Sequence, residues 1–575
     1  MLTVADAPTI VHAFAAQAYR PDSSLRLWSK HLLFSRKTDD LFLDRFGPQL
    51  AAEVHDWAAL LVQLGVEPGD RVIHVSENRY EWIITDLAIQ FARGIHVPVH
   101  APLTGPQIAW QIQDSGAKVV ILSGPAQAAK LVGQEVSLAS VRHYVSYDPC
   151  EQSLAGKPVQ WLKDVWERPS AIDPKKIRDA ALALTTPDDV VTILYTSGTT
   201  GEPKGVMLTQ RNLATNALAT MQRFYNDSPP RDASLGAVRR LNFLPLSHIF
   251  ARTCDLYLWI MEGSELAIAE SRDTVLADAS AVQPTFMNGV PYFYDRVCRG
   301  LKEKALENVP GILKKTLGGR IEQCCAGGAA LPVHLYDYFQ GQGVPLLLGY
   351  GLTESSPVIS MSTVNHYRRG ASGQPIGSIE VKIAGDGEIL TRGPHVMVGY
   401  YNRPAATAEV LQDGWLSTGD LGHVDDDGYL FITGRKKELI VTLGGKNIAP
   451  VYLEGLLTQD PLIAQALVVG DGRSFLTALI VPNPEPLRAE IIARSIPVTS
   501  PAEALVHPQV LFLYQERIAR CLADVAPYEQ VKKFTLLPRG FSIEREEMTA
   551  KLSLRRKIIE EHFAAEIEGM YRREG

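Results

Sequence analysis

Cysteine is scarce in this chain, and the way the few cysteines are placed excludes several classes of protein. The 575 residues contain six cysteines, and none of them has the spacing of a metal site. Two are adjacent, which makes them poor disulfide partners for each other. The pattern excludes a disulfide scaffold and gives no sign of a catalytic cysteine. We expect free thiols in a reducing, cytoplasmic compartment at Cys150, Cys254, Cys298, Cys324, Cys325 and Cys521.

Long apolar runs and an excess of basic residues are also missing. No segment approaches the roughly 20 apolar residues of a transmembrane helix, and the first lysine or arginine is Arg20, which does not resemble a signal peptide. The net charge of −7 argues against a nucleic-acid-binding surface. Without an amphipathic or polybasic segment, we expect peripheral membrane contact at most. The oligomeric state has no sequence signal.

What is present is the composition of a large soluble globular protein. Hydrophobic residues make up 46% and charged residues 21% of the chain, with a mean hydropathy of −0.02. Short apolar runs at 71–75, 94–99 and 118–122 predict strands, and the patterns at 81–91 and 105–114 predict helices between them. This alternation predicts an α/β fold with a parallel sheet.

The pattern changes after Gly373, where short apolar runs are separated by turn signals. Asp386-Gly387 and Asp427-Gly428 each stand between two such runs. We therefore predict a β-rich subdomain that completes a large N-terminal domain of parallel α/β layers spanning residues 1–434.

A smaller α+β domain, residues 435–575, is predicted to follow. Apolar residues recur at helical spacing from Leu554 to Tyr571, which predicts one terminal helix. The proline-richer stretch 482–504 predicts an irregular stretch or a surface one.

The most informative stretch is LYTSGTTGEPKGVM, from Leu194 to Met207. The β-branched run 190–194 predicts a buried strand that leads directly into a loop of glycines and hydroxyls. Such a loop brings backbone N–H groups and hydroxyls to a phosphate, and Lys204 adds a positive charge. It is not the common P-loop, because Pro203 precedes the lysine and Gly205 follows it. The alternative is a glycine-rich turn between two strands.

This stretch resembles the phosphate loop of the adenylate-forming superfamily, which includes acyl-CoA synthetases, peptide-synthetase adenylation domains and luciferases. The resemblance implies attack of a carboxylate on the α-phosphate of ATP, with release of pyrophosphate. It also implies phosphate-binding roles for Thr196, Ser197, Gly198, Thr199, Thr200, Gly201 and Lys204, of which Thr196 and Lys204 take part in catalysis.

A second stretch, YGLTES, is similar to the next signature of that superfamily. Glu354 offers a hard oxygen ligand for Mg²⁺, and Thr353 offers a hydroxyl to a phosphate. Tyr350 offers a flat face to a purine, next to Gly351. Read alone, the hexapeptide fits a turn followed by a helix cap.

Three further segments match the family's nucleotide site. In AGGAALP, the resemblance makes Gly328 and Ala329 adenine contacts. In STGD, Asp420 has the carboxylate that can accept both hydrogen bonds of a ribose diol. Arg435 matches the second member of the family's ribose pair.

Two segments resemble the family's acid-binding side. His248, in LPLSHIFAR, is a candidate substrate residue; a helix cap or a satisfied core histidine is the alternative. Gly289 lies in QPTFMNGVPYFYDRV, which resembles the segment lining the acyl tunnel. The segment 387–404 also resembles the family, but we assign it no catalytic part.

The stretch TGRKKELIVTLGGKNIAP resembles the superfamily's hinge and the loop after it. Lys436 matches the hinge position, about which the small domain swings as a mobile lid between two half-reactions. Gly444 and Gly445 match the loop that approaches the thiol of coenzyme A. The same residues are also compatible with a purely structural interpretation, a helix or strand end followed by a Gly-Gly turn.

The chain departs from the family near its C-terminus. Family members carry a lysine there that bridges the carboxylate and the α-phosphate, with an arginine three residues later. Aligning Thr549 and Arg556 puts Ser553 at that position, and Lys551 lies two residues earlier. Three interpretations remain open: Lys551 acts from a shifted loop, the register changes so that Arg555 replaces the arginine, or the lysine is absent. We favour Lys551 as a catalytic residue.

Within the superfamily, the hinge and the small domain look most like those of long-chain fatty acyl-CoA synthetases. The expected substrate is a carboxylic, and most simply a fatty, acid; the expected cofactors are ATP, Mg²⁺ and coenzyme A. Two alternatives stay open. One is a fatty acyl-AMP ligase that passes its product to an acyl carrier protein. The other is a degenerate, non-catalytic acyl- or nucleotide-binding protein.

Overall fold

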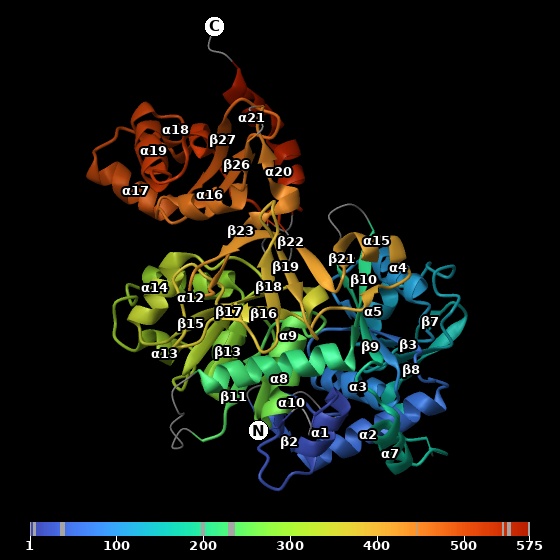
Figure 1. Cartoon of the computed structure of the whole chain (residues 1–575). Helices are drawn as coiled ribbons and strands as arrows, with labels where there is room; N and C mark the ends of the chain where they lie inside the picture. The colour runs from blue at the N-terminus through green and yellow to red at the C-terminus, as the bar shows by residue number, and fades with distance from the viewer. Residues whose placement is uncertain are drawn as a thin grey trace.

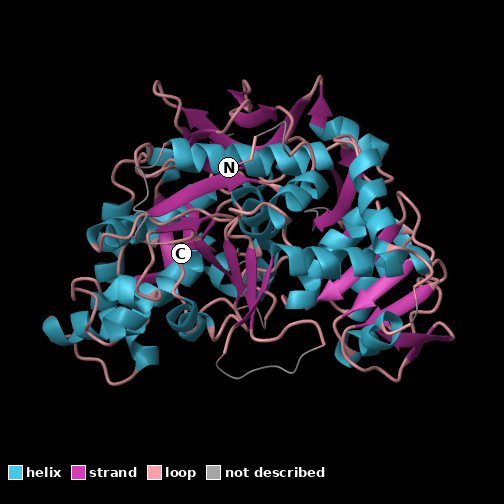
Figure 2. Ribbon diagram, turned by 90° about the horizontal axis from the view of Figure 1, so that it is seen from below, coloured by secondary structure: helices cyan, strands magenta, loops and turns pink. Residues whose placement is uncertain are grey.

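The computed structural model describes residues 2–3, 7–34, 41–168, 170–196, 202–227, 236–443, 446–542, 545–548 and 554–572. Most of the chain before residue 376 forms two large mixed sheets with helices around them (Figures 1 and 2). The C-terminal residues form a smaller unit at the top of Figure 1. The predicted α/β fold with a C-terminal α+β unit is therefore confirmed.

The first large sheet is parallel through its centre and antiparallel at both edges. Its order is β17-β16-β15-β14-β13-β11-β12-β1-β2. In that order the strands are Gln374–Pro375, Val358–Met361, Leu346–Gly351, Gln323–Ala326, Phe286–Gly289, Arg239–Asn242, Glu265–Ile268, Arg26–Ser29 and Leu43–Phe46.

The second large sheet contains the strands predicted from the first apolar runs. Its order is β20-β10-β9-β4-β3-β5-β6-β8-β7, and pairing is parallel from β9 to β8. In that order the strands are Gly399–Tyr400, Lys204–Thr209, Val190–Thr196, Ile95–His100, Arg71–Ser76, Val119–Leu122, His143–Ser146, Lys157–Trp161 and Ser153–Leu154.

The helices before residue 376 connect and cover these sheets. The predicted helices at 81–91 and 105–114 are α3 and α4. The elements are α1 Ile10–Ala18, α2 Gly47–Gln63, α3 Tyr80–Phe91, α4 Gly105–Ser115, α5 Pro125–Lys130, α6 Leu162–Trp166, α7 Pro174–Leu184, α8 Gln210–Asn226, α9 Ile249–Ala251, the π-helix η2 Arg252–Tyr257, α10 Leu258–Glu262, α11 Val275–Val282, α12 Pro291–Glu303, α13 Ile312–Thr316, α14 Val333–Gly341 and the short 3₁₀ turn η3 Thr353–Ser355.

The β-rich subdomain predicted after Gly373 is a third sheet. The turns at Asp386-Gly387 and Asp427-Gly428 join strands as predicted, with φ of +84° and +81° at the two glycines. The elements are β18 Glu380–Ile383, β19 Glu388–Arg392, α15 Pro404–Val410, β21 Leu411–Gln412, β22 Trp415–Val424, β23 Leu430–Arg435 and the 3₁₀ turn η4 Lys436–Glu438.

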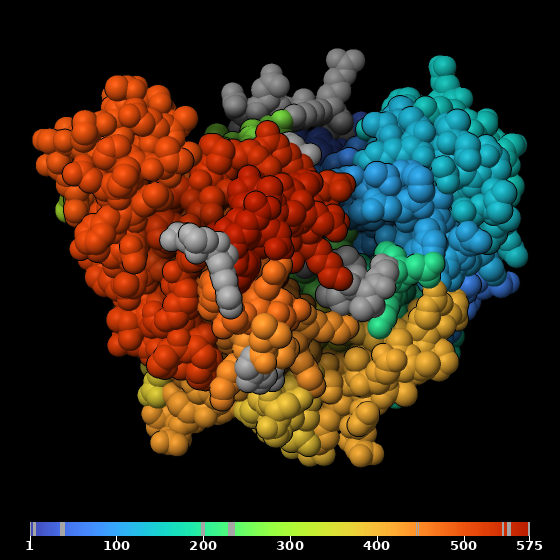
Figure 3. Space-filling view, turned by 90° about the horizontal axis from the view of Figure 1, so that it is seen from above, coloured from blue at the N-terminus to red at the C-terminus, as the bar shows by residue number. Residues whose placement is uncertain are grey.

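The C-terminal unit has its own apolar cores. Two clusters of buried residues draw their members from residues 440–571 alone. Seen from above, this unit is a continuous orange-to-red body (Figure 3). Its elements are β24 Ile440–Val441, β25 Asn447–Ile448, α16 Pro450–Leu457, β26 Ile463–Val469, β27 Leu476–Pro482, α17 Pro484–Ala493, α18 Pro501–Ala504, α19 Pro508–Cys521, the 3₁₀ turn η5 Pro527–Glu529, β28 Val531–Leu536, α20 Arg556–His562 and α21 Ala564–Tyr571.

One sequence prediction about this unit is wrong. The terminal helix is broken at Phe563, whose ring is buried against Phe541 with ring centroids 6.0 Å apart, so that two short helices replace one. The stretch 482–504 lies mostly on the surface, the second of its two predicted alternatives, and it contains α17 and α18. Each of these helices begins with a proline at its first position, where the missing N–H breaks no hydrogen bond.

Candidate active site

The predicted phosphate loop joins two neighbouring antiparallel strands. Thr196 is the last residue of β9 and Lys204 the first of β10, and the two are register partners. The Thr196 hydroxyl donates to the Lys204 carbonyl at 3.5 Å. The two ends of the loop are thus held side by side, where β9 ends and β10 begins in the second large sheet. The loop residues themselves, Ser197, Gly198, Thr199, Thr200 and Gly201, lie outside the described residues.

A segment for which no catalytic part is expected supports this loop. Strand β20 pairs with β10, and the backbone N–H of Tyr401 donates to the Gly205 carbonyl at 2.7 Å. The Lys204 ammonium lies over the ring of Tyr400, 5.0 Å from its centroid. The strand therefore carries an aromatic side chain to the cation of the phosphate loop.

The same tyrosine contacts the predicted metal ligand. The Tyr400 hydroxyl donates to Glu354 Oε1 at 2.9 Å, and the Met397 N–H donates to the Glu354 carbonyl at 2.9 Å. Burial, followed by the nearby Glu354 charge, raises the pKa of Tyr400 above its usual value. Lys204 and Glu354, 150 positions apart in the chain, therefore meet on one ring.

Glu354 belongs to a tight turn directly after β15. A Cβ at Gly351 would lie 1.7 Å from the Pro357 carbonyl oxygen, so only glycine fits where this turn begins. Thr353 opens the turn and is half-buried. The described residues contain no group of three or more metal-ligating side chains. A single carboxylate still fits Mg²⁺, which typically takes one or two carboxylates together with substrate phosphates.

The predicted ribose-binding residues form a second cluster, which includes one residue close in sequence to Glu354. Asp420 and Arg435 are register partners on β22 and β23, and Arg435 Nε lies 2.9 Å from Asp420 Oδ1. The Tyr350 hydroxyl donates to Asp420 Oδ2 at 2.8 Å. Burial raises the pKa of the Asp420 carboxyl, against the opposing effects of Arg435 and Tyr350. Tyr350 lies only four residues before Glu354, so β15 leads from one cluster to the other.

The candidate adenine and acid-binding residues also come together. Gly327, just before Gly328, donates its N–H to the Gly289 carbonyl at 3.2 Å. A Cβ at Gly327 would lie 3.0 Å from the ring of Phe250, on the helix that His248 caps. Gly328 has a φ of +78° and faces open space, and Ala329 is exposed. The ends of β13 and β14 and the start of α9 thus share one region.

His248 and Gly289 also have local structural tasks. His248 Nδ1 accepts from the Phe250 N–H at 3.4 Å, so the cap alternative is realised in this structure. A Cβ at Gly289 would lie 2.9 Å from the Tyr294 ring, which explains a glycine there by packing. Neither observation assigns a substrate contact.

Lys436 is tied to the β18–β19 turn. Its ammonium lies 2.6 Å from Asp386 Oδ2 and 2.8 Å from Glu388 Oε2, and these carboxylates raise its pKa to about 12. The other Glu388 oxygen accepts from the Gly419 N–H at 2.9 Å, next to Asp420. The predicted hinge position is therefore connected to the predicted ribose site.

Three predicted residues of the C-terminal unit lie outside the described residues: Gly444, Gly445 and Lys551. Ser553, on which the departure from the family depends, does too. Arg556, the residue used to align this segment, forms an ion pair with Glu454 and donates to the Val468 carbonyl at 3.2 Å. It therefore packs within its own unit. Arg555 lies 3.8 Å from Glu546.

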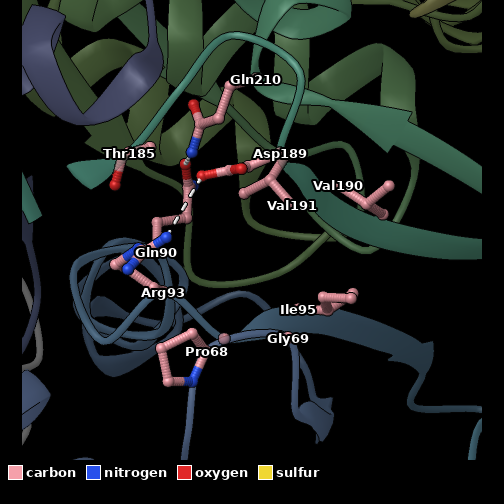
Figure 4. Close-up of a pocket in the computed structure, with 11 residues that line it drawn as sticks. Pro68, Gly69, Gln90, Arg93, Ile95, Thr185, Asp189, Val190, Val191 and Gln210 are labelled. Carbon is pink, nitrogen blue, oxygen red and sulfur yellow. Dashed lines mark hydrogen bonds and ion pairs between the residues drawn. The ribbon is translucent and has the colours of Figure 1, made fainter.

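One cavity among the described residues lies away from all the predicted site residues. It has a volume of about 340 Å³ and is lined by residues such as Arg93, Ile95, Asp189 and Val190 (Figure 4). Ile95 and Val190 begin β4 and β9, whereas the phosphate loop follows the end of β9. Since ligands of open α/β sheets bind beyond the carboxyl ends of the strands, this cavity is not the substrate site.

Six free cysteines are present, as predicted. Burial raises the pKa of Cys325 to about 12 and also raises that of Cys254, so these thiols stay protonated. No helix among the described residues is long and apolar enough to cross a membrane.

The chain matches two family models. Residues 48–401 match the model described as AMP-binding enzyme, and residues 437–575 match the AMP-binding enzyme C-terminal domain. A long-chain-fatty-acid–CoA ligase, FadD15 of Mycobacterium tuberculosis, is 32% identical over 95% of this chain and 95% of its own.

Solved structures share the fold. The anthranilate CoA ligase AuaEII, in complex with anthranoyl-AMP, superposes with a TM-score of 0.76 at 20% identity, over 98% of this chain and all of its own (100%). The o-succinylbenzoate CoA synthetase of Bacillus subtilis, in complex with ATP and magnesium ion, gives 0.70 at 22% identity, over 95% and 98%.

Proposed function

The chain belongs to the AMP-binding enzyme family, and from this premise we propose that it is an acyl-CoA synthetase acting on a fatty acid. In the first step the acid's carboxylate attacks the α-phosphate of ATP, which forms acyl-AMP and releases pyrophosphate. In the second step the thiol of coenzyme A attacks the acyl carbon, which forms acyl-CoA and releases AMP. The name and full-length match of FadD15 support the fatty acid as substrate.

One observation carries the proposal. Lys204 and Glu354 meet on Tyr400, while Tyr350, Asp420 and Arg435 form a cluster that β15 links to Glu354. A cation beside a metal-binding carboxylate suits a triphosphate, and a buried carboxylate with polar partners suits a ribose diol.

Each predicted residue then has one task. Thr196, Lys204, Thr353 and the phosphate loop hold the phosphates, and Glu354 holds Mg²⁺. The metal, when bound, neutralises charge on the phosphate oxygens. Asp420 and Arg435 hold the ribose, and Tyr350, Gly351, Gly328 and Ala329 surround the adenine. His248 and Gly289 lie on the acid-binding side.

We further propose that residues 435–575 act as the mobile lid. Lys436 is the hinge, Gly444 and Gly445 guide the thiol, and Lys551 supplies the cation that the alignment displaces at Ser553. The separate apolar cores of this unit support a rigid-body motion, because no core packing has to be broken within it. The six free cysteines support a cytoplasmic location.

The test is product analysis by mass spectrometry. The protein is incubated with ATP, Mg²⁺ and acids of graded chain length, with and without coenzyme A. We expect acyl-CoA, AMP and pyrophosphate, with one preferred range of chain lengths. If acyl-AMP accumulates even with coenzyme A present, the assignment of coenzyme A as the acyl acceptor is wrong. An acyl carrier protein would then be indicated as the acceptor. ATP binding without any product would indicate the degenerate homologue.

A further inference from the structure

Tyr400 occupies the space between two charged groups of the proposed site. Its ring carries the Lys204 ammonium at 5.0 Å, and its hydroxyl donates to Glu354 Oε1 at 2.9 Å. Within the described residues, this hydroxyl is the only hydrogen-bond donor to the Glu354 carboxylate, and Glu354 and Lys204 form no ion pair with each other. Tyr400 thus contacts both the Lys204 ammonium and the Glu354 carboxylate, which form no ion pair with each other among the described residues.

The tyrosine itself is firmly placed. Its side chain is buried, and β20 pairs with β10 through Val206. Its backbone N–H donates to the Thr407 hydroxyl at 2.9 Å, and a Cβ at the neighbouring Gly399 would lie 2.8 Å from the Thr407 methyl carbon. Because the backbone is fixed from two sides, the hydroxyl has a fixed position from which to orient the carboxylate.

We infer that Tyr400 is a positioning residue: it keeps the Glu354 carboxylate oriented for a divalent cation and keeps Lys204 available for phosphate. With Oε1 accepting from the tyrosine, Oε2 has no hydrogen-bond donor among the described residues and would be available to a bound cation. Without the ring, the two opposite charges would pair with each other, and each would be lost to the triphosphate. This inference rests on the proposed function and adds a residue for which the sequence predicts no catalytic part.

Two variants separate the two contacts. Tyr400→Phe keeps the aromatic face under Lys204 and removes only the hydrogen bond to Glu354. Tyr400→Leu removes both. The matched control is Tyr401→Phe, since Tyr401 contacts the phosphate-loop strand through its backbone N–H, which the substitution keeps. Thermal unfolding of each variant shows whether the fold is retained.

The readout is nucleotide binding by calorimetry, with and without the metal, which needs no turnover. For Tyr400→Phe we expect about tenfold weaker binding of Mg²⁺–ATP and unchanged binding of ATP in EDTA. For Tyr400→Leu we expect weaker binding under both conditions. Tyr401→Phe should match the wild type throughout.

A double-variant cycle tests whether the tyrosine acts through the glutamate. On a Glu354→Gln background, Tyr400→Phe should cause no further loss of Mg²⁺–ATP affinity. A further tenfold loss there, or a single Tyr400→Phe variant that binds Mg²⁺–ATP like the wild type, would overturn the inference. If the wild type itself binds no ATP, the proposed function fails first, and the two failures are therefore distinguishable.

Discussion

At the scale of single residues, the site depends on side chains that are held before any ligand arrives. Glu354 is fixed by Tyr400, and Asp420 by Tyr350 and Arg435. Groups held in this way lose little freedom when a ligand binds, which favours both affinity and rate. Substitutions here should therefore change ligand binding and catalysis more than they change stability.

Glu354→Gln should lower the rate of acyl-AMP formation by about a hundredfold or more, because the neutral amide binds Mg²⁺ poorly. The amide oxygen still accepts from the Tyr400 hydroxyl, so the unfolding midpoint should stay close to that of the wild type. Pyrophosphate release measures the rate. Glu409→Gln, an exposed position on α15, is the charge-matched control and should be unaffected. Near-normal activity of Glu354→Gln would remove this residue from the metal site.

Asp420→Asn should weaken ATP binding by about tenfold, because the amide cannot accept from both ribose hydroxyls while Tyr350 and Arg435 donate to it. Tyr350→Phe removes one of those donors and keeps the ring, so adenine contact should survive with a smaller loss. Calorimetric titration with ATP measures both. Equal affinity of Asp420→Asn and wild type would contradict the ribose assignment.

At the scale of elements, several strands were predictable and the contacts between them were not. The apolar runs at 71–75 and 118–122 correspond to β3 and β5 to within one residue, since buried parallel strands are continuous apolar stretches. Tyr400 was missed as a candidate because its two partners lie 46 and 196 residues away. No local pattern records a pairing of that separation.

The C-terminal elements show where local patterns mislead. Helical spacing continues through Phe563, yet the chain breaks there so that its ring can pack on Phe541. Prolines at 484 and 501 leave irregular structure open as an interpretation of this surface stretch, although the same residue opens a helix when it stands at the first position. Tertiary packing and position within the element, rather than composition, decided both cases.

The ion pairs of Lys436, the first residue of η4, lead to a prediction about the hinge. Lys436→Met removes the ion pairs to Asp386 and Glu388, which lie at a half-exposed site and contribute at most about 1 kcal/mol. Overall stability should therefore hardly change. Because these pairs stabilise only the arrangement described here, the ratio of the two half-reaction rates should shift by up to about fivefold. Single-turnover assays of each step measure it, with Lys437→Met as the neighbouring control; an unchanged ratio would exclude Lys436 from the hinge.

The segment before α20 supplies a second prediction at this scale. Lys551→Ala should abolish acyl-AMP formation and spare thioester formation from supplied acyl-AMP, because only the first step makes and breaks bonds at the α-phosphorus, whose crowded transition state needs the cation. Arg555→Ala tests the competing alignment in the same pair of assays. If adenylation survives in the lysine variant, another residue supplies the cation.

At the scale of the whole molecule, buried histidines set the response to acid. Burial lowers the pKa of His55, His96 and His395 to about 4 each. The unfolded chain protonates these groups near pH 6.5, so their contribution is fully present above that pH and is lost as the pH falls towards 4. Asp255, whose pKa burial raises to about 6, opposes this trend, whereas His74, whose pKa burial also lowers, adds to it.

We therefore expect the free energy of unfolding to fall by several kcal/mol between pH 6.5 and 4.5. All eight tryptophans lie at or before Trp415, so their fluorescence in urea follows the part of the chain that holds these histidines. His395→Gln should reduce the pH dependence by about one proton. His423→Gln, at an exposed histidine, should leave it unchanged. A pH-independent unfolding midpoint would contradict the burial of all three histidines.

The bonds around Lys436 have a consequence for the order of events in a catalytic cycle. Asp420 forms an ion pair with Arg435, and the neighbouring Lys436 forms one with Glu388. Glu388 in turn accepts a hydrogen bond from the N–H of Gly419, which precedes Asp420. These five residues form a closed ring of contacts. A rotation at Lys436, the proposed hinge, must therefore disturb the Asp420 carboxylate, which is proposed to bind the ribose. On the proposed function, departure of AMP and resetting of the lid then become a single kinetic event, and added AMP should slow both by the same factor.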